Sequence, residues 1–330
     1  FEKDFPSTTT VILEENYRST QTILTAANQI ISKNKIRPEK NLFTKNGEGE
    51  RIALYTAYNE TDEANFVAET AAQQITAEVP PEEIAVLYRA NFQSRVLEEA
   101  FLHRNIPYQV LGVRFFERKE VKDVLYYLKA ARNPDNIADL ARIINVPRRG
   151  IGKTTLAKIF NRQENMLAPS MQGKIFQFRT ILKNIQHSTE TLKPSALIKQ
   201  ILQVSGIESD LKNQKEGGEE RIENIRELVT LASKYDSLPQ EQAIEKLLED
   251  AALATDQDSL SEGRKGVRLM TVHASKGLEF NTVFITGLED DLFPHKKMDE
   301  HKMSAEESEE ERRLFYVAIT RAKKRVFLTY

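Results

Sequence analysis

The sequence predicts an α/β protein in which a parallel-sheet domain is interrupted by an all-helical domain. Strand and helix patterns alternate over residues 10–103, strand patterns are absent from residues 117–254, and strands resume at Val267. Because strands that alternate with helices build a parallel sheet, both flanking parts are expected to contribute to one sheet. The helical middle is then an insertion into the sheet domain.

The first part of the chain contains three strand-then-helix pairs. The predicted strands are residues 10–14, 51–57 and 84–89, and the helices that follow them are residues 21–32, 62–77 and 93–103. Ser19 or Thr20 is suited to cap the first helix, because a hydroxyl at this position accepts a hydrogen bond from a free backbone N–H.

Helical patterns then follow one another until the strands return. The predicted helices are residues 121–131, 137–144, 155–161, 195–204, 219–233 and 240–251. Strands are predicted at 267–272, 282–286 and 325–329, with a long helix at 306–323 whose acidic start, 306–311, is expected to be solvated. We therefore expect a sheet domain of residues 1–112 and 267–330 and a helical domain of residues 113–266.

The composition limits the kinds of site that the chain can hold. It has 330 residues, no cysteine and five histidines without metal-ligand spacing, which excludes disulfides and thiolate zinc sites and predicts no protein metal site. No stretch approaches the roughly 20 apolar residues of a membrane span, so we expect no membrane partner. Residues 113–266 carry 25 basic and 22 acidic side chains, so the middle is more basic than the chain as a whole, whose net charge is −2.

Three segments have the composition of ligand sites. Arg18 lies where a predicted strand gives way to a helix, a junction at which free N–H groups favour anions, although a plain surface arginine is the alternative. The polar residues 271–279 follow a predicted buried strand, as in a ligand loop or an ordinary connection. Arg321 falls on the apolar stripe of the helix predicted at 306–323, where a guanidinium needs an anion, either a carboxylate or a phosphate.

These segments occur in order in one chain, and together they resemble the late motifs of superfamily 1 helicases of the UvrD, PcrA and Rep type. The resemblance extends through residues 87–91, 93–95, 147–152 and 293–295 and is weakest over 163–191. It implies that the sheet domain is the second RecA-like motor domain, a P-loop-NTPase-type sheet without its own phosphate loop. The helical insertion would be the accessory domain.

The resemblance also implies roles for single residues in binding ATP. Tyr17 would lie against the adenine, and Arg18 and Arg321 would reach the γ-phosphate as catalytic arginine fingers. Glu279 would accept a hydrogen bond from the ribose. ATP and Mg²⁺ are expected to bind fully only together with a first motor domain.

The same family pattern implies a track for single-stranded DNA. Arg89, Asn91, His273 and His295 would line it, mostly through sugar-phosphate and base-face contacts that suit sequence-independent translocation. The polarity implied by the family is 3′ to 5′. The expected location is the cytoplasm, in association with the nucleoid.

The departure from the family pattern is large. The sequence has no Walker A motif, no Asp-Glu pair for Mg²⁺ and no glutamine-containing adenine motif, and Phe1 corresponds to a point just past the first motor domain. We expect either an excised piece or a polypeptide that needs a first motor domain as its partner, and an isolated chain that is inactive.

Residues 150–155 end like a phosphate loop, but the pattern requires glycine at 147, where this chain has Pro147. The favoured interpretation is a hairpin that binds the backbone of duplex DNA, with a plain solvated basic face as the alternative. The residues predicted to take part are Arg148, Gly150, Gly152, Lys153 and Thr154.

Three functions compete on these grounds. The chain is the motor half of an ATP-dependent DNA helicase, a non-enzymatic duplex-binding module or regulatory partner of a motor protein, or a self-sufficient NTPase that uses Lys153.

Overall fold

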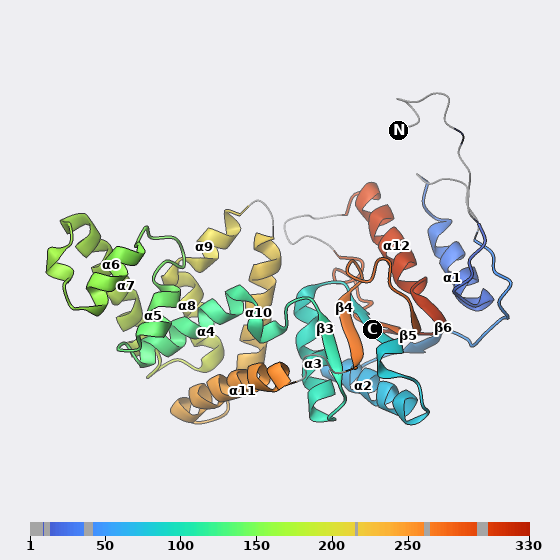
Figure 1. The fold of residues 1–330 in the computed structure, drawn as a ribbon, viewed down its shortest axis with the longest axis horizontal. Coiled ribbons are helices and arrows are strands. Elements are labelled where there is room, and N and C mark those ends of the chain that lie inside the picture. Colours follow the sequence, from blue (N-terminus) through green and yellow to red (C-terminus); the bar gives the residue numbers. More distant parts are fainter. Residues whose placement is uncertain (1–8, 10–13, 36–41, 215–216, 261–264, 296–302) are drawn as a thin grey trace. The chain divides into compact units, whose positions relative to one another are not determined.

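The structure is a computed structural model that describes residues 9, 14–35, 42–214, 217–260, 265–295 and 303–330 (Figure 1). The chain forms two compact units. We call residues 1–112 with 263–330 the sheet unit and residues 113–262 the helical unit. The predicted α/β class with one parallel sheet is confirmed.

The sheet has six parallel strands in the order β1-β6-β5-β2-β4-β3. Their bounds are β1 Ala53–Tyr55, β2 Ile84–Tyr88, β3 Tyr108–Leu111, β4 Val267–Thr271, β5 Phe280–Ile285 and β6 Ala322–Thr329. Val86 of β2 pairs with Leu269 on one side and with Phe284 on the other. The two flanking parts of the sequence therefore interleave, and neither part makes this sheet alone.

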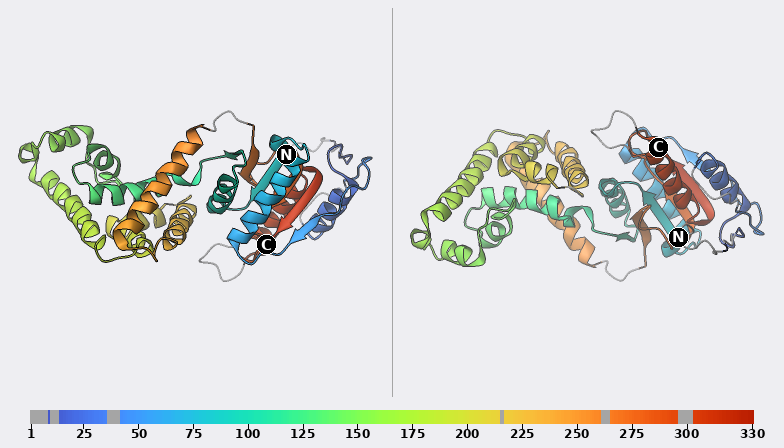
Figure 2. Two further views of the ribbon diagram at one scale, coloured as in Figure 1. Left: turned by 90° about the horizontal axis from the view of Figure 1, so that it is seen from below. Right: turned by 90° about the horizontal axis from the view of Figure 1, so that it is seen from above.

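Helices cover both faces of the sheet (Figure 2). They are α1 Gln21–Ile31, α2 Glu60–Thr76, α3 Ser94–His103 and α12 Ala305–Ile319. Successive residues of a strand point to opposite faces. Accordingly, Ala85 and Leu87 belong to the core beneath α1 and α12, whereas Ile84 and Val86 belong to the core beneath α2 and α3.

The ends of several elements differ from the prediction. Residues 10–13 of the first predicted strand lie outside the described residues, and nearby Glu15 makes an isolated parallel bridge to Phe43. The helix predicted at 306–323 stops at Ile319, because Ala322 begins β6 and pairs with Phe280. Pairing with β5 thus overrides the helix propensity of this segment.

The helical unit has a single core to which its helices contribute. They are α4 Lys119–Arg132, α5 Ile137–Ile143, α6 Lys153–Phe160, α7 Pro169–Ser188, α8 Pro194–Ser205, α9 Ile207–Lys212, α10 Gly218–Ser233 and α11 Gln240–Leu260. Helices α7 and α9 were not predicted. Among the described helices, none combines the length and the apolar content that crossing a membrane requires.

A buried carboxyl joins α2 to the sheet. Glu63 accepts hydrogen bonds from the backbone N–H of Gly287 at 2.7 Å and from the Thr329 hydroxyl at 2.5 Å. Burial raises the pKa of Glu63 above its ordinary value, and the two donors oppose this shift only in part. The folded protein therefore holds a proton on Glu63 at pH values where the unfolded chain has lost it.

This linkage predicts how Glu63→Gln changes stability with pH. The stability that the protonated group provides is present below the ordinary glutamate pKa and is lost as pH rises through the raised pKa. Relative to wild type, the glutamine variant should therefore gain free energy of unfolding as pH rises from about 4 to 8. Denaturant titrations across this range measure the difference, and Glu69→Gln, at an exposed position on the same helix, is the control. A wild-type-like pH profile for Glu63→Gln would contradict the prediction.

Candidate functional site

Four charged side chains meet at the amino-terminal ends of β5 and β6, and we call Arg18, Glu279, Arg321 and Lys323 the amino-edge cluster. The Arg18 Nε donates to Glu279 Oε2 at 2.6 Å, and its Nη1 donates to the Thr320 carbonyl at 3.1 Å. Lys323 Nζ lies 3.3 Å from the other Glu279 oxygen. The structure thus brings together three residues predicted to bind the nucleotide.

Arg18 lies just before α1, as predicted, while most of the strand predicted to precede it is outside the described residues. The contacts of Arg18 are at the amino edge of β5 and β6, and a turn holds it there. The Asn16 side-chain oxygen accepts from the backbone N–H groups of Arg18 and Ser19, both at 2.8 Å. The Ser19 hydroxyl donates to the Ala322 carbonyl at 2.7 Å. These bonds fix Arg18 beside the start of β6.

Arg321 lies in the turn between α12 and β6, so its predicted place on a helical stripe is wrong. Its guanidinium donates to the carbonyls of Val317 at 3.0 Å and Leu278 at 3.1 Å and to the Thr320 hydroxyl at 3.3 Å. Burial lowers the pKa of Arg321, and the charge of Arg18 lowers it further. These three acceptors are neutral, so the cluster carries a surplus of positive charge that suits an anion.

Tyr17 precedes Arg18 and is 80% exposed. Its hydroxyl donates to Glu15 Oε2 at 3.0 Å, and this hydrogen bond raises the pKa of Tyr17. The ring therefore remains a neutral aromatic surface, held at one end by its hydroxyl. Such a surface can stack against a flat ligand.

The residues predicted to contact single-stranded DNA belong to the opposite edge of the sheet. Arg89 and Asn91 follow the carboxyl end of β2, and His273 follows that of β4. His295 joins them through Glu311, which accepts from both the Arg89 guanidinium and the His295 backbone. We call these four predicted residues the carboxyl-edge group.

Glu311 itself corrects the prediction that the acidic start of α12 is solvated. Its side chain is only 11% exposed, and Glu309 is also buried, whereas Glu306 and Glu310 are exposed. The acidic run therefore divides between an outer face and an inner face of the helix.

One short segment connects the two edges of the sheet. Residues 272–279 leave the carboxyl end of β4 and reach the amino end of β5 without an intervening helix. His273 at the start of this segment is exposed, and Glu279 at its end belongs to the amino-edge cluster. The polar residues of this segment thus serve two different surfaces.

The helical unit holds the predicted hairpin between α5 and α6. The Asn145 side-chain oxygen accepts from the N–H groups of Ile151 at 3.0 Å and Arg149 at 3.3 Å, and its amide donates to the Ile151 carbonyl. Ile151 is buried in the core of the helical unit. Gly150 has a φ of +72°, whereas Gly152 has a φ of −79° and precedes the first residue of α6. Only Gly150 therefore needs the conformational freedom of glycine.

The basic residues around this hairpin divide into two kinds. The Arg149 guanidinium points inward, where it donates to the Val146 and Ser205 carbonyls, both at 2.9 Å, and lies over the ring of Phe178. Arg149 is therefore a structural residue and not part of an exposed basic face. Arg148 is exposed, as are Gly150, Gly152 and Thr154.

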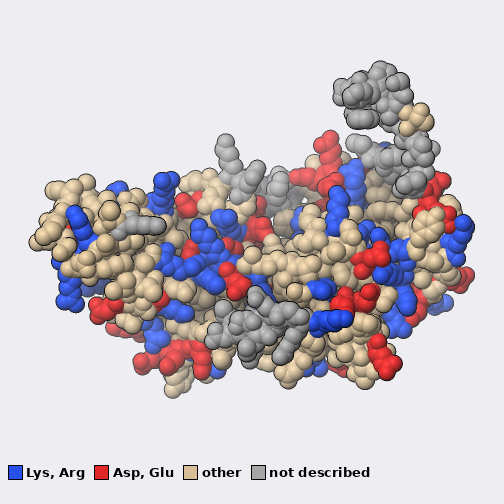
Figure 3. Space-filling view, viewed as in Figure 1, with Lys and Arg blue, Asp and Glu red and all other residues tan. Residues whose placement is uncertain are grey.

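The face of the protein seen in Figure 3 is not uniformly basic. In the view of Figure 3, basic and acidic side chains are interspersed.

The residues before α6 form helix α5 and a turn, and no strand, so the hairpin lacks the strand that precedes a phosphate loop. This geometry argues against the self-sufficient NTPase.

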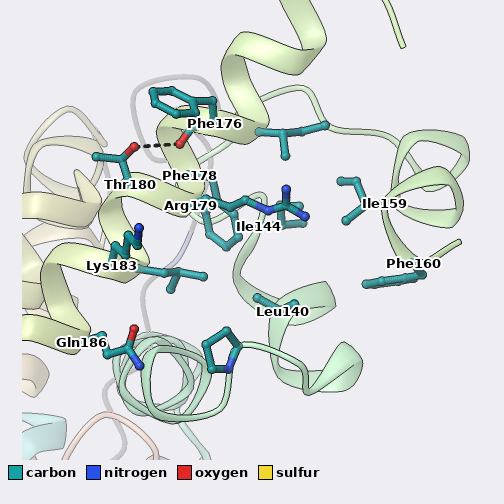
Figure 4. Close-up of a pocket in the computed structure, with 13 residues that line it drawn as sticks. Leu140, Ile144, Ile159, Phe160, Phe176, Phe178, Arg179, Thr180, Lys183 and Gln186 are labelled. Atoms are coloured by element: carbon teal, nitrogen blue, oxygen red, sulfur yellow. Dashed lines mark hydrogen bonds between the residues drawn. The ribbon is translucent and has the colours of Figure 1, made fainter. Parts of the chain in front are cut away.

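An apolar hollow of about 410 Å³ lies among α5, α6 and α7 and was not predicted. Leu140, Ile159 and Leu182 line it, and Figure 4 shows Lys183 and Arg179 beside them. Phe176 on its lining is 73% exposed. None of the residues that line the hollow was predicted to bind DNA.

Comparison with known proteins identifies the family. Residues 11–330 match the model of the UvrD-like helicase C-terminal domain. Over its whole length the chain is 40% identical to an ATP-dependent DNA helicase PcrA of Staphylococcus epidermidis, 38% to that of Bacillus subtilis and 39% to that of Staphylococcus aureus. The chain spans about half of these relatives, 48%, 47% and 48% of their lengths. It belongs to the UvrD-like helicase C-terminal domain family.

Proposed function

We propose that this chain is the C-terminal part of an ATP-dependent 3′ to 5′ DNA helicase. Its sheet unit would act as the second motor domain and its helical unit as the accessory domain. The observation that carries the proposal is the amino-edge cluster, in which Arg18 and Arg321 come together from opposite ends of the chain. Its relatives are named as ATP-dependent DNA helicases, which supports the same function.

The residues of the amino-edge cluster fit the triphosphate of ATP. Arg321 is already held by neutral oxygens, so its charge remains available for an incoming γ-phosphate. Arg18 would turn part of its hydrogen bonding from Glu279 to phosphate, and Glu279 would then accept from the ribose. Tyr17 would cover the adenine. ATP with Mg²⁺ supplies the phosphoryl group and neutralises charge on it, and we assign the metal ligands to a first motor domain.

The carboxyl-edge group would bind single-stranded DNA at the edge of the sheet opposite the amino-edge cluster. Arg89 supplies N–H donors for phosphate, and the exposed His273 and half-buried Asn91 supply polar and flat surfaces for sugar and base. The segment 272–279 joins this edge to Glu279. A movement of Glu279 when the nucleotide binds or leaves would therefore be passed to the DNA-binding edge through only a few residues.

The second candidate is a non-enzymatic duplex-binding module or a regulatory partner of a motor protein. The exposed hairpin at 150–154 favours it, since this feature needs no nucleotide. The amino-edge cluster favours the helicase, because a module that only holds duplex has no use for two arginines gathered at the amino ends of β5 and β6.

Measurement of ATP turnover by the purified chain, with and without a first motor domain from a close relative, separates these functions. We expect no turnover by the chain alone and DNA-stimulated turnover by the pair. Turnover by neither preparation would favour the binding module. Turnover by the chain alone that is lost in Lys153→Ala would establish the self-sufficient NTPase instead.

A further inference from the structure

We propose that Glu311 is a positioning residue for single-stranded DNA, because it holds the Arg89 guanidinium and the backbone at His295 in the arrangement that receives the strand. This inference rests on the proposed function. It assigns a role to a residue of α12 that is not itself expected to touch DNA.

The contacts of Glu311 come from two separate loops. Arg89 donates to Glu311 Oε1 from Nη2 at 2.8 Å and from Nε at 3.0 Å, and Nε also lies 3.1 Å from Oε2. The His295 backbone N–H donates to Oε2 at 2.9 Å. One carboxylate thus joins the loop after β2 to the loop after β5.

The pair leaves part of the guanidinium for a ligand. A guanidinium has five N–H donors, and Glu311 occupies the one on Nε and one on Nη2. The Arg89 side chain is 20% exposed, so its other donors can reach a phosphate. Its backbone is also fixed, since the Gln93 side-chain oxygen accepts from the N–H groups of Arg89 at 3.0 Å and Ala90 at 2.8 Å. An arginine fixed in this way loses little conformational freedom when DNA binds.

The pair is expected to persist when DNA binds. If phosphate pulled Arg89 away, the Glu311 carboxylate would remain largely buried without its counter-charge, which is costly. A DNA phosphate should therefore bind the remaining donors of Arg89 while the Arg89–Glu311 pair stays formed.

A positioning role predicts a change in DNA affinity opposite to the change that charge alone would cause. Glu311→Gln removes a negative charge near the DNA track, which by electrostatics alone should tighten binding of a polyanion. If Glu311 positions Arg89, the same change should weaken binding. Glu310 provides a matched control, because it is adjacent, 71% exposed and paired only at the surface with Arg313 at 2.8 Å.

The test is the affinity of the complete helicase for a labelled single strand at several salt concentrations. The variants are Glu311→Gln, Glu310→Gln, Arg89→Gln and the double variant of Arg89 and Glu311. We expect Glu311→Gln to bind about tenfold more weakly, the scale of one well-placed charged contact, and Glu310→Gln to bind like wild type or slightly tighter. In the Arg89→Gln background, loss of Glu311 should have a much smaller effect, limited to what passes through the His295 backbone.

The possible outcomes distinguish a failure of the positioning role of Glu311 from a failure of the proposed DNA-binding function. Glu311→Gln binding as tightly as Glu310→Gln, or losses that multiply in the double variant, would overturn the positioning role. Wild-type affinity in Arg89→Gln would instead contradict the proposed DNA track itself. If Glu311→Gln does not fold, Glu311→Asp keeps the charge but shortens the reach to Arg89 and should still weaken binding, and unchanged binding in it would overturn the inference.

Discussion

Arg321→Ala should nearly abolish ATP turnover by the complete helicase while leaving its affinity for DNA close to normal. Arginine fingers are worth roughly 10³ to 10⁵ in rate, because they meet charge that develops in the transition state. The Val317 and Leu278 carbonyls hold the Arg321 guanidinium in place, at the edge of the sheet opposite the carboxyl-edge group, as the proposed role requires. Steady-state ATP hydrolysis with saturating single-stranded DNA measures the loss.

Two further variants separate catalysis from folding. Arg325→Ala removes a nearby arginine that pairs with the exposed Glu50 at 2.6 Å, and it should retain turnover. Arg321→Lys keeps the charge without the planar fork and should recover only part of the rate. Near-normal hydrolysis by Arg321→Ala would remove Arg321 from the catalytic assignment.

Gly152→Val should weaken duplex binding by about tenfold or more, the effect of losing at least one charged contact, with little change in single-strand affinity. A Cβ added at Gly152 meets no atom within 4 Å, and its φ of −79° is open to any residue. The substitution should therefore obstruct what approaches from outside, and thermal unfolding of the variant measures any cost of valine at the N-cap of α6. Titration of labelled duplex and labelled single strand at several salt concentrations tests this.

Two comparisons sharpen the hairpin experiment. Arg148→Ala, at an exposed site, should lower the salt slope of duplex binding by about one if it loses one phosphate contact. Gly150→Ala strains a backbone at φ +72° and should cost stability as well. Unchanged duplex binding in Gly152→Val and Arg148→Ala would reassign the hairpin to another partner.

Elements with a clear apolar pattern in the sequence were predicted, and elements with a weak pattern were missed. The apolar run of β2 and the alternation around it predicted the parallel sheet, which was confirmed. Strand β3 was missed because it has four half-buried residues after Pro107 and depends on pairing with β4. Helix α7 could have been found, since its buried residues Ile175, Phe178, Leu182 and Ile185 recur at helical spacing.

The candidate site depended on long-range contacts that sequence spacing does not contain. Arg18 and Glu279 are 261 residues apart and meet only when β6 and β5 are adjacent. The family resemblance, confirmed by the comparisons, was therefore the only route to proposing them together. The sequence predicted that Glu311 is solvated with the other acidic residues at the start of α12. Its burial depends on its contact with Arg89, which is far away in the sequence and which the local pattern does not reveal.

Strand displacement by a first motor domain joined to this chain tests the proposed helicase function. The substrates are duplexes with either a 3′ or a 5′ single-stranded tail, each with and without ATP. We expect ATP-dependent unwinding of the 3′-tailed duplex, no unwinding of the 5′-tailed one, and loss of unwinding in Arg321→Ala. Equal unwinding by the first motor domain alone, or none by the joined protein despite DNA binding, would contradict the proposed function.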